Sequence, residues 1–296
     1  MEGIISTITS RMWRLWDNIE PMVRFEFIYR HNYVRYISYP IGLLIITSCF
    51  LYGQWPNSHD MVVDTVGDKF FSYMMVIFIM LTTSIGCFHA ALSISSEKEK
   101  KTLTILRMSG MSSFDIIAGK SATSFLFAIF IIFPHLPLVL ACPFLGGITF
   151  SKVFGGIAIL MVMTLFYTTS GVFVSMLAKK NYISIALAIF MLFSVHFGGY
   201  FMDYICFSEY DNYGYARSTD DAIFYTLSPM EIWQNYLWEQ TNSRRFYPTH
   251  KIPSLTVAGM EFPAFIIAAI FYLASTFLIC GAGTGYMERY LKWRED

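Results

Sequence analysis

The fold of this chain is organised around residues 95–120, SSEKEKKTLTILRMSGMSSFDIIAGK, which carry the densest charge in a very apolar sequence. This run lies between two segments that are long enough to cross a membrane. Its charged side chains, among them Glu97, Glu99 and Arg107, cannot enter hydrocarbon without a large free-energy cost. The run must therefore lie in water or against a water-exposed partner.

Local signals within the run predict two short helices with an elbow between them. Ser96 and Glu99 have the spacing of a capping box for the first helix, and Gly110 is suited to the left-handed residue that ends it. Ser112 and Asp115 have the spacing of a second capping box. This second box predicts a helix that leads into the next apolar segment.

Several positions in the run form a recognisable pattern. They are Glu97, Thr102-Leu103, Leu106, residues 109–112, Ile116-Ile117 and Gly119-Lys120. In this pattern the run resembles the cytoplasmic segment after the second membrane helix in permease subunits of type-two ATP-binding-cassette (ABC) exporters. A generic positively charged loop is the alternative, but such a loop would not need Leu103, Leu106 and Met111 among its charges.

The resemblance implies that this segment contacts a separate ATPase subunit and carries its motion to the helices. ATP and Mg would be bound by that subunit, so this chain would hold no cofactor and would not be an enzyme. Apolar side chains of the segment are expected to enter a cleft of the partner, while charged ones fix the register. The expected ATPase-contact residues are Glu97, Glu99, Thr102, Leu103, Leu106, Arg107, Met111, Ser112 and Asp115.

The composition excludes an ordinary soluble protein. Of the 296 residues, 55% are hydrophobic and only 14% are charged, whereas a soluble domain carries about 25% charged residues. The formal net charge is zero, which gives no bulk argument for a nucleic-acid partner. The five cysteines form no Cys-x-x-Cys pair, so neither a zinc site nor a disulfide framework is indicated.

Apolar segments predict an all-α polytopic membrane protein, with residues 1–296 forming a single transmembrane domain. Each segment offers roughly 19 to 26 residues, which at about 1.5 Å per residue are enough to cross a hydrocarbon core of about 30 Å. The six predicted spans cover about residues 34–52, 70–94, 121–144, 153–178, 182–207 and 262–286.

Two other segments are expected to lie at the membrane surfaces. Residues 18–36 predict an N-terminal amphipathic helix in the membrane interface, with aromatic residues on one face and basic residues on the other. Residues 208–261 form a long acidic external loop. Within it, Ser228 and Glu231 have capping-box spacing, which predicts a short helix that places Trp233 and Tyr236 on the outer membrane surface.

The distribution of Lys and Arg predicts the orientation in the cell (inner) membrane. If both termini are cytoplasmic, fifteen of the 21 Lys and Arg residues lie inside, and residues 95–120 lie with them. These residues are Arg11, Arg14, Arg24, Arg30, Arg35, Lys98, Lys100, Lys101, Arg107, Lys120, Lys179, Lys180, Arg289, Lys292 and Arg294.

Intramembrane prolines and histidines are the candidate substrate-path residues. Pro134 and Pro137 predict a kink or break in the outer half of the third span. His89, His135 and His196 fall on three different spans. They are interpreted first as neutral histidines bonded within the bundle, second as substrate contacts and third as metal or haem ligands. No metal site is predicted.

Small residues at four-residue spacing predict close contacts between helices. Such pairs are Gly86 with Ala90 and Ser184 with Ala188, and a further group lies at residues 281–285. Packing within the chain is sufficient to explain them, and a dimer interface is an additional interpretation.

Taken together, these features predict the membrane-spanning permease subunit of an ATP-driven ABC exporter. It would work with a second copy or a paralogue, and with ATPase subunits below. The lack of charge in the spans favours an amphipathic or lipid-like cargo. Two alternatives are a non-transport scaffold driven by an ABC ATPase, and a membrane metal or haem protein that uses the three intramembrane histidines.

Overall fold

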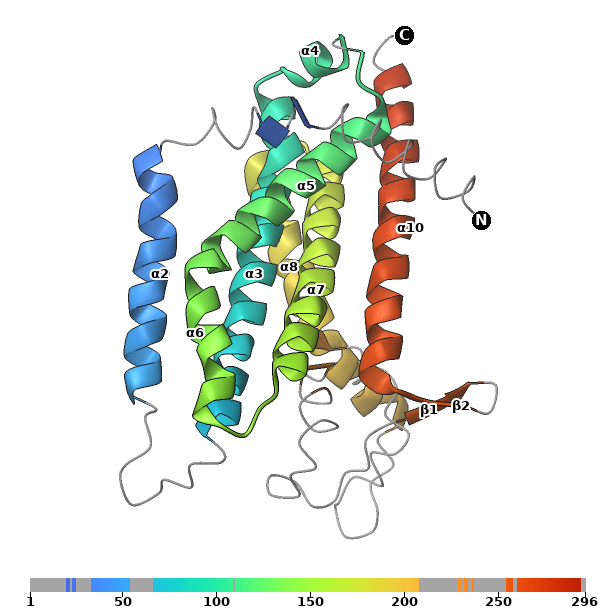
Figure 1. Cartoon of the computed structure of the whole chain (residues 1–296). Helices are drawn as coiled ribbons and strands as arrows, with labels where there is room; N and C mark the ends of the chain where they lie inside the picture. Colours follow the sequence, from blue (N-terminus) through green and yellow to red (C-terminus); the bar gives the residue numbers. More distant parts are fainter. Residues whose placement is uncertain are drawn as a thin grey trace, which may run out of the picture.

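The computed structural model describes residues 20–21, 23–24, 33–53, 66–108, 110–207, 228–229, 232–233, 236, 254–257 and 260–293. In this part of the chain, long helices stand side by side in one bundle (Figure 1). The helices are α2 (Tyr33–Gly53), α3 (Val66–Glu99), α4 (Leu103–Met108), α5 (Ser113–Ile132), η3 (Phe133–His135), α6 (Leu136–Ala141), η4 (Cys142–Leu145), α7 (Phe150–Leu177), α8 (Asn181–Phe207) and α10 (Ala264–Trp293).

The expectation of a multi-pass helical membrane protein is confirmed. Five helical stretches in the described residues are long and apolar enough to cross a membrane, and α2 adds a shorter apolar stretch, Ser38–Gly53. The five are Val66–Glu99, Ser113–Leu145, Phe150–Leu177, Asn181–Gly199 and Phe265–Tyr290. Most of the predicted interfacial helix, residues 18–36, lies outside the described residues, so that prediction is not tested here.

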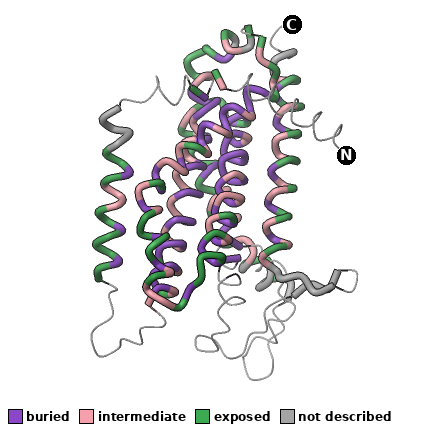
Figure 2. Tube along the Cα trace, in the orientation of Figure 1, coloured by how far each residue is buried: buried purple, intermediate pink, exposed green. Residues whose placement is uncertain are grey.

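The centre of the bundle is the contact between α3 and α7. Buried residues are concentrated along these two helices, while α2 and α10 show many exposed residues (Figure 2). α5 and α8 also pack on α3, and α10 packs on α7 and α5. The longest helix therefore touches most of the bundle.

Small residues allow α3 and α7 to approach closely, as predicted. A Cβ atom added to Gly171 of α7 would lie 2.8 Å from the Cβ of Ala90, and one added to Gly86 of α3 would lie 2.9 Å from Cγ2 of Thr168. Ser184 of α8 contributes a further contact, since its Oγ donates to the Ala91 carbonyl at 2.5 Å.

The glycines near the end of α10 behave differently from one another. Gly283 packs against Met176 and Ile117, whereas Gly281 and Gly285 have open space around them in the described part of the chain.

The predicted break in the third span is confirmed. α5 ends at Ile132, a short 3-10 turn follows, and α6 resumes at Leu136. Pro134 and Pro137 lie in the first turns of these two segments. A proline lacks the N–H that would continue the helical ladder, and its ring crowds the preceding turn.

The structure corrects the prediction for residues 228–236. Pro229, Ile232, Trp233 and Tyr236 are helical, but the last three are buried in the bundle and not spread on the membrane surface. The Trp233 ring meets Phe71 edge-on, with centroids 5.4 Å apart. The Tyr236 hydroxyl donates to the Lys152 carbonyl at 2.7 Å. An aromatic helix face has the same local pattern whether it faces lipid or protein, so the sequence could not distinguish the two.

A short hairpin precedes the last helix, which the all-α prediction did not include. β1 (Ser254–Val257) pairs antiparallel with β2 (Met260–Pro263). Two residues ending in Gly259 separate the strands in the sequence, which is typical of a hairpin. The last helix begins at Ala264 and not at Phe262, because Phe262 is paired with Leu255 in the sheet.

The close approach of α3 and α7 makes a prediction about stability. Gly171→Val should lower the free energy of unfolding by about 1–3 kcal/mol, because the new side chain meets the α3 backbone and Ala90. Thermal unfolding of the purified protein in detergent would measure the change. Gly281→Val is the matched control, since open space surrounds Gly281. Equal destabilisation by both substitutions would contradict the close contact.

Candidate functional site

The charged run, residues 95–120, lies at one end of the bundle, around α4. α4 lies beyond the ends of the long helices, at the end where α10 finishes (Figure 1). α3 continues through Ser96 and Glu99, with the Lys100 N–H donating to the Ser96 carbonyl at 3.0 Å. The predicted capping box at these two residues is therefore wrong, since they end a long helix and do not begin a short one. The chain then turns at Lys101, which has a φ of 60°.

The second half of the elbow is as predicted. Gly110 has a φ of 83°, the left-handed conformation that a glycine adopts without a steric penalty. Ser112 and Asp115 form a reciprocal capping box at the start of α5. The Asp115 N–H donates to Ser112 Oγ at 3.1 Å, and the Ser112 N–H donates to Asp115 Oδ2 at 3.2 Å. These bonds satisfy backbone donors that the helix start leaves unpaired.

The inner face of α4 is anchored on the bundle. Leu103 is only 2% exposed, and Leu106 and Met111 are half-buried beside it. The sequence analysis expected all three side chains in a cleft of a partner, but the bundle itself covers Leu103. The apolar cluster that receives them consists of Ala90, Ile94, Ile116, Ile117, Val172, Met176 and Met287.

The outer face of α4 presents two apolar side chains that the sequence analysis did not single out. Ile105 is 67% exposed and Met108 is 82% exposed. Their spacing of three residues places them on one helix face, opposite to Leu103. In the sequence, Leu103 and Leu106 have the same three-residue spacing as Ile105 and Met108. Only the packing shows that Ile105 and Met108 are the pair that faces outward.

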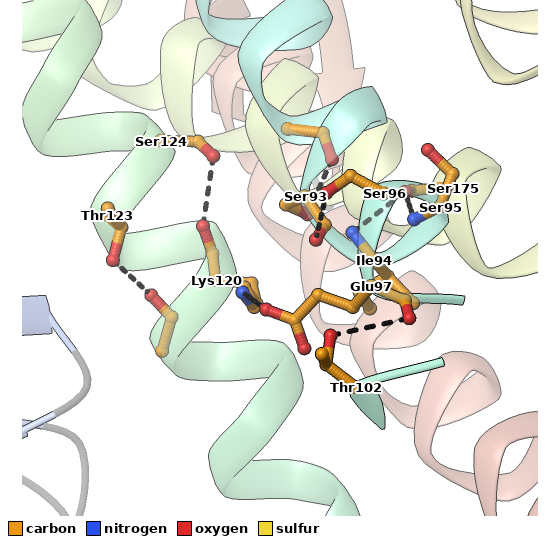
Figure 3. Close-up of polar contacts among 12 residues, drawn as sticks. Ser93, Ile94, Ser95, Ser96, Glu97, Thr102, Lys120, Thr123, Ser124 and Ser175 are labelled. Atoms are coloured by element: carbon orange, nitrogen blue, oxygen red, sulfur yellow. Dashed lines mark hydrogen bonds and ion pairs between the residues drawn. The ribbon is translucent and has the colours of Figure 1, made fainter. Parts of the chain in front are cut away.

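A buried ion pair ties the end of α3 to α5 (Figure 3). The Lys120 ammonium donates to Glu97 Oε1 at 2.5 Å, and the side chain of Lys120 has no exposed surface. Ser124 Oγ donates to the Lys120 carbonyl at 3.0 Å in the next turn of α5. A buried ammonium requires such a partner, because desolvation of an unpaired charge costs several kcal/mol.

Further polar contacts tie the same end of α3 to α7, α8 and α10. Lys98 donates to the carbonyls of Met176 and Ala178 where α7 ends, and its ammonium lies 4.7 Å from the centre of the Tyr290 ring. The carbonyls at a helix C-terminus carry partial negative charge, which suits a lysine.

Ser175 of α7 accepts hydrogen bonds from two backbone N–H groups of α3. The donors are Ile94 at 3.0 Å and Ser95 at 2.8 Å (Figure 3). Ser95 Oγ in turn donates to Asn181 Oδ1 at 2.8 Å, at the start of α8. The end of α3 thus contacts α5, α7, α8 and α10.

The remaining residues expected at the ATPase contact are placed as follows. Glu99, Thr102 and Ser112 are exposed, while Asp115 is buried in its capping box. The side chain of Arg107 lies outside the described residues. Contact of any of these with an ATPase stays a prediction.

The three intramembrane histidines have separate neighbours. His89 Nδ1 lies 2.9 Å from Ser124 Oγ, and His196 Nδ1 lies 3.1 Å from Tyr167 Oη. His135 is buried, with its ring 5.3 Å from that of Phe78. Within the described residues, no group of three or more His, Cys, Asp or Glu could hold a metal ion.

Two cavities lie in the described part of the bundle, and neither is lined by the five predicted path residues. One, of about 480 Å³, lies between α7, α8 and α10. The other, of about 40 Å³, lies beside the break between α5 and α6. Since none of the five lines either cavity, their place on a substrate path stays a prediction. The five are His89, Pro134, His135, Pro137 and His196.

The fold and this site define a multi-pass helical membrane protein with a short amphipathic helix anchored at one end. A family model described as "ABC-2 family transporter protein" matches residues 37–286. The chain belongs to the ABC-2 transporter family, and it is a permease of that type, a membrane transport component that is not itself catalytic. Among curated proteins, none matches the chain.

The Glu97–Lys120 pair makes a prediction about stability. Glu97→Ala should lower the free energy of unfolding by about 3–5 kcal/mol, because it removes the carboxylate that faces the buried Lys120 ammonium. The double variant Glu97→Ala/Lys120→Met should recover much of this loss, since no buried charge remains. Denaturation followed by tryptophan fluorescence would measure both.

Glu99→Ala is the control for the ion pair, because Glu99 is exposed on the same turn. Its effect should be within the small range of surface substitutions, about 0.5 kcal/mol. A double variant no more stable than Glu97→Ala would show that the pair is not what holds α3 to α5.

Proposed function

We propose that this chain is the permease subunit of an ATP-driven exporter, and that a separate ABC ATPase binds the outer face of α4. The observation that carries the proposal is the division of α4 into two faces. Leu103 fixes the helix to the bundle, while Ile105 and Met108 stand exposed at its outer side. Exposed apolar side chains on a small polar elbow are typical of a site that a partner covers.

The contacts at the end of α3 supply a physical route for coupling. Glu97, Lys98 and Ser95 bind α5, α7 and α8, and Lys98 also lies against α10. α4 follows α3 after a short turn, and its Leu103 packs in the apolar cluster that also contains Ala90 and Ile94 of α3. A push on α4 by the ATPase would therefore act on several helices together, through these hydrogen bonds and the Glu97–Lys120 ion pair.

Two such chains, or this chain and a paralogue, would form the transport unit, with two ATPase subunits beneath. We further propose that α4 and both termini lie in the cytoplasm of the cell. The start of α2 and the end of α10 lie at the α4 end of the bundle (Figure 1). Among the described residues, Lys98, Lys100 and Lys101 lie where α3 ends, and Lys179 and Lys180 lie between α7 and α8. Lysines at this end favour the cytoplasmic side.

Association with the ATPase should depend on the outer face of α4. Met108→Asp should weaken co-purification of the ATPase at least about tenfold, because a carboxylate in an apolar interface would be desolvated without a partner. The measurement is affinity purification of tagged chain from its own membranes, with mass spectrometry of proteins that carry phosphate-binding and ABC signature motifs.

Phe144→Asp is the matched control for association. Phe144 is 80% exposed, nearly as exposed as Met108, but it lies in η4 at the opposite end of the bundle. This variant should keep the ATPase bound. Normal co-purification with Met108→Asp, in protein that inserts normally, would contradict the proposed contact.

The orientation makes a separate prediction. In a variant whose native cysteines are replaced, Ile105→Cys should react with a membrane-impermeant thiol reagent only after the cells are opened and bound ATPase is washed from the membranes. Phe144→Cys should react in intact cells, because it lies at the other end of the bundle. Labelling of Ile105→Cys from outside would reverse the proposed topology and remove the ATPase from reach.

A further inference from the structure

A groove opens on the side of the bundle between α8 and α10. Both helices pack on α7, and within the described residues neither packs extensively on the other. The space that remains between them has a volume of about 480 Å³. Phe166 of α7 and Tyr272 of α10 form its floor, with their rings in edge-to-face contact and centroids 4.7 Å apart.

The two walls of the groove are helical stripes of matching length. Each wall follows the i, i+4, i+7 spacing, which places three residues on one helix face over about 10 Å. None of these six described residues is charged, and the ones at the rim are exposed. The walls consist of Val195, Gly199 and Met202 on α8 and of Phe271, Ser275 and Leu278 on α10.

The groove opens toward the region that lipid fills. α8 and α10 contain the two least buried of the five membrane-spanning stretches. The lining residues that are exposed at the rim are all apolar, namely Met202, Phe271 and Leu278. A ligand that enters the groove therefore arrives through the hydrocarbon of the bilayer. The lining residues lie in the second half of α8 and around the middle of α10.

Among the described residues that line the groove, the polar side-chain atoms are few and neutral. They are the hydroxyls of Ser228, Ser275 and Tyr272. Ser228 Oγ donates to the His196 carbonyl at 3.1 Å, which fixes this residue against α8. A charged ligand would find no opposite charge among the described lining residues, and its desolvation would oppose binding.

An alkyl chain suits this lining. In hydrocarbon there is no hydrophobic driving force for association, so binding depends on van der Waals contact and shape. A narrow channel between two helix faces supplies both along the length of a flexible chain. A volume of about 480 Å³ is also within the range of about 300–1,000 Å³ that small-molecule sites occupy.

We propose that the groove between α8 and α10 is a binding site for one acyl chain of a bilayer lipid. This assignment depends on the groove and on its membrane setting. It does not depend on the ATPase or on the direction of transport.

The experiment uses the full-length protein in nanodiscs of phosphatidylcholine that carries a diazirine on one acyl chain. After illumination, mass spectrometry locates the labelled residues. Lipid at the outer surface can label the rim, but Phe166 and Tyr272 are buried beneath it. Label on these two floor residues is the result expected from a chain inside the groove.

Adjacent glycines of α8 provide a matched pair of variants. Gly199 lines the groove, whereas Gly198 has open space around it. Gly199→Trp should lower labelling of the floor about tenfold, because an indole occupies the space that the chain needs. Gly198→Trp should leave it unchanged. Ser275→Trp fills the groove from the opposite wall and replaces Gly199→Trp if that variant does not purify as a folded protein.

Three results would overturn the proposal. They are an unlabelled floor with a labelled rim, unchanged floor labelling in folded Gly199→Trp or Ser275→Trp, and an equal decrease with Gly198→Trp. The assay contains neither ATPase nor nucleotide. Its outcome is therefore independent of the co-purification experiment that tests the proposed function.

Discussion

The arrangement of helices at the α4 end depends on an ammonium group that is removed from water. Lys120 has no exposed side-chain surface, and the Glu97 carboxylate 2.5 Å away is what makes its burial tolerable. The pair requires the end of α3 to lie against one particular turn of α5. Lys98, the next residue, donates to the Met176 and Ala178 carbonyls at the end of α7. The side chains of Ser95, Glu97 and Lys98 lie within about one turn of α3. Together they contact α5, α7, α8 and α10.

The central contact of α3 and α7 complements these polar bonds. Backbone N–H groups of Ile94 and Ser95 donate to Ser175, and the glycines at 86 and 171 bring the two helices together. Within a membrane, close contact and internal hydrogen bonds replace the hydrophobic effect as the source of helix association. Small residues make these contacts between α3 and α7, since glycine, alanine and serine let the two backbones approach.

α4, a helix of six residues, is held on the bundle by its inner face while its outer face stays exposed. Its length is too short for independent stability, since isolated helices need about 12–15 residues. Leu103 therefore supplies the anchor, and the capping box of Ser112 and Asp115 fixes the start of the next helix. Because the inner face is already held by the bundle, Ile105 and Met108 remain exposed without loss of structure.

The opposite end of the bundle differs, since Trp233 and Tyr236 fold inward and close the core there.

The sequence by itself determined the class of the protein and its local turns. Long apolar runs can satisfy their backbone groups in hydrocarbon only as helices, and the turns at Gly110, Ser112 and Pro134 depend on residues within about one helical turn. The tertiary structure alone decided which side chains face inward. Lys120 meets Glu97 across 23 residues of sequence, and Leu103 and Ile105 differ only in what packs on them. Burial of this kind is a property of helices that meet in space, and the spacing of residues along one helix is the same whichever face is covered.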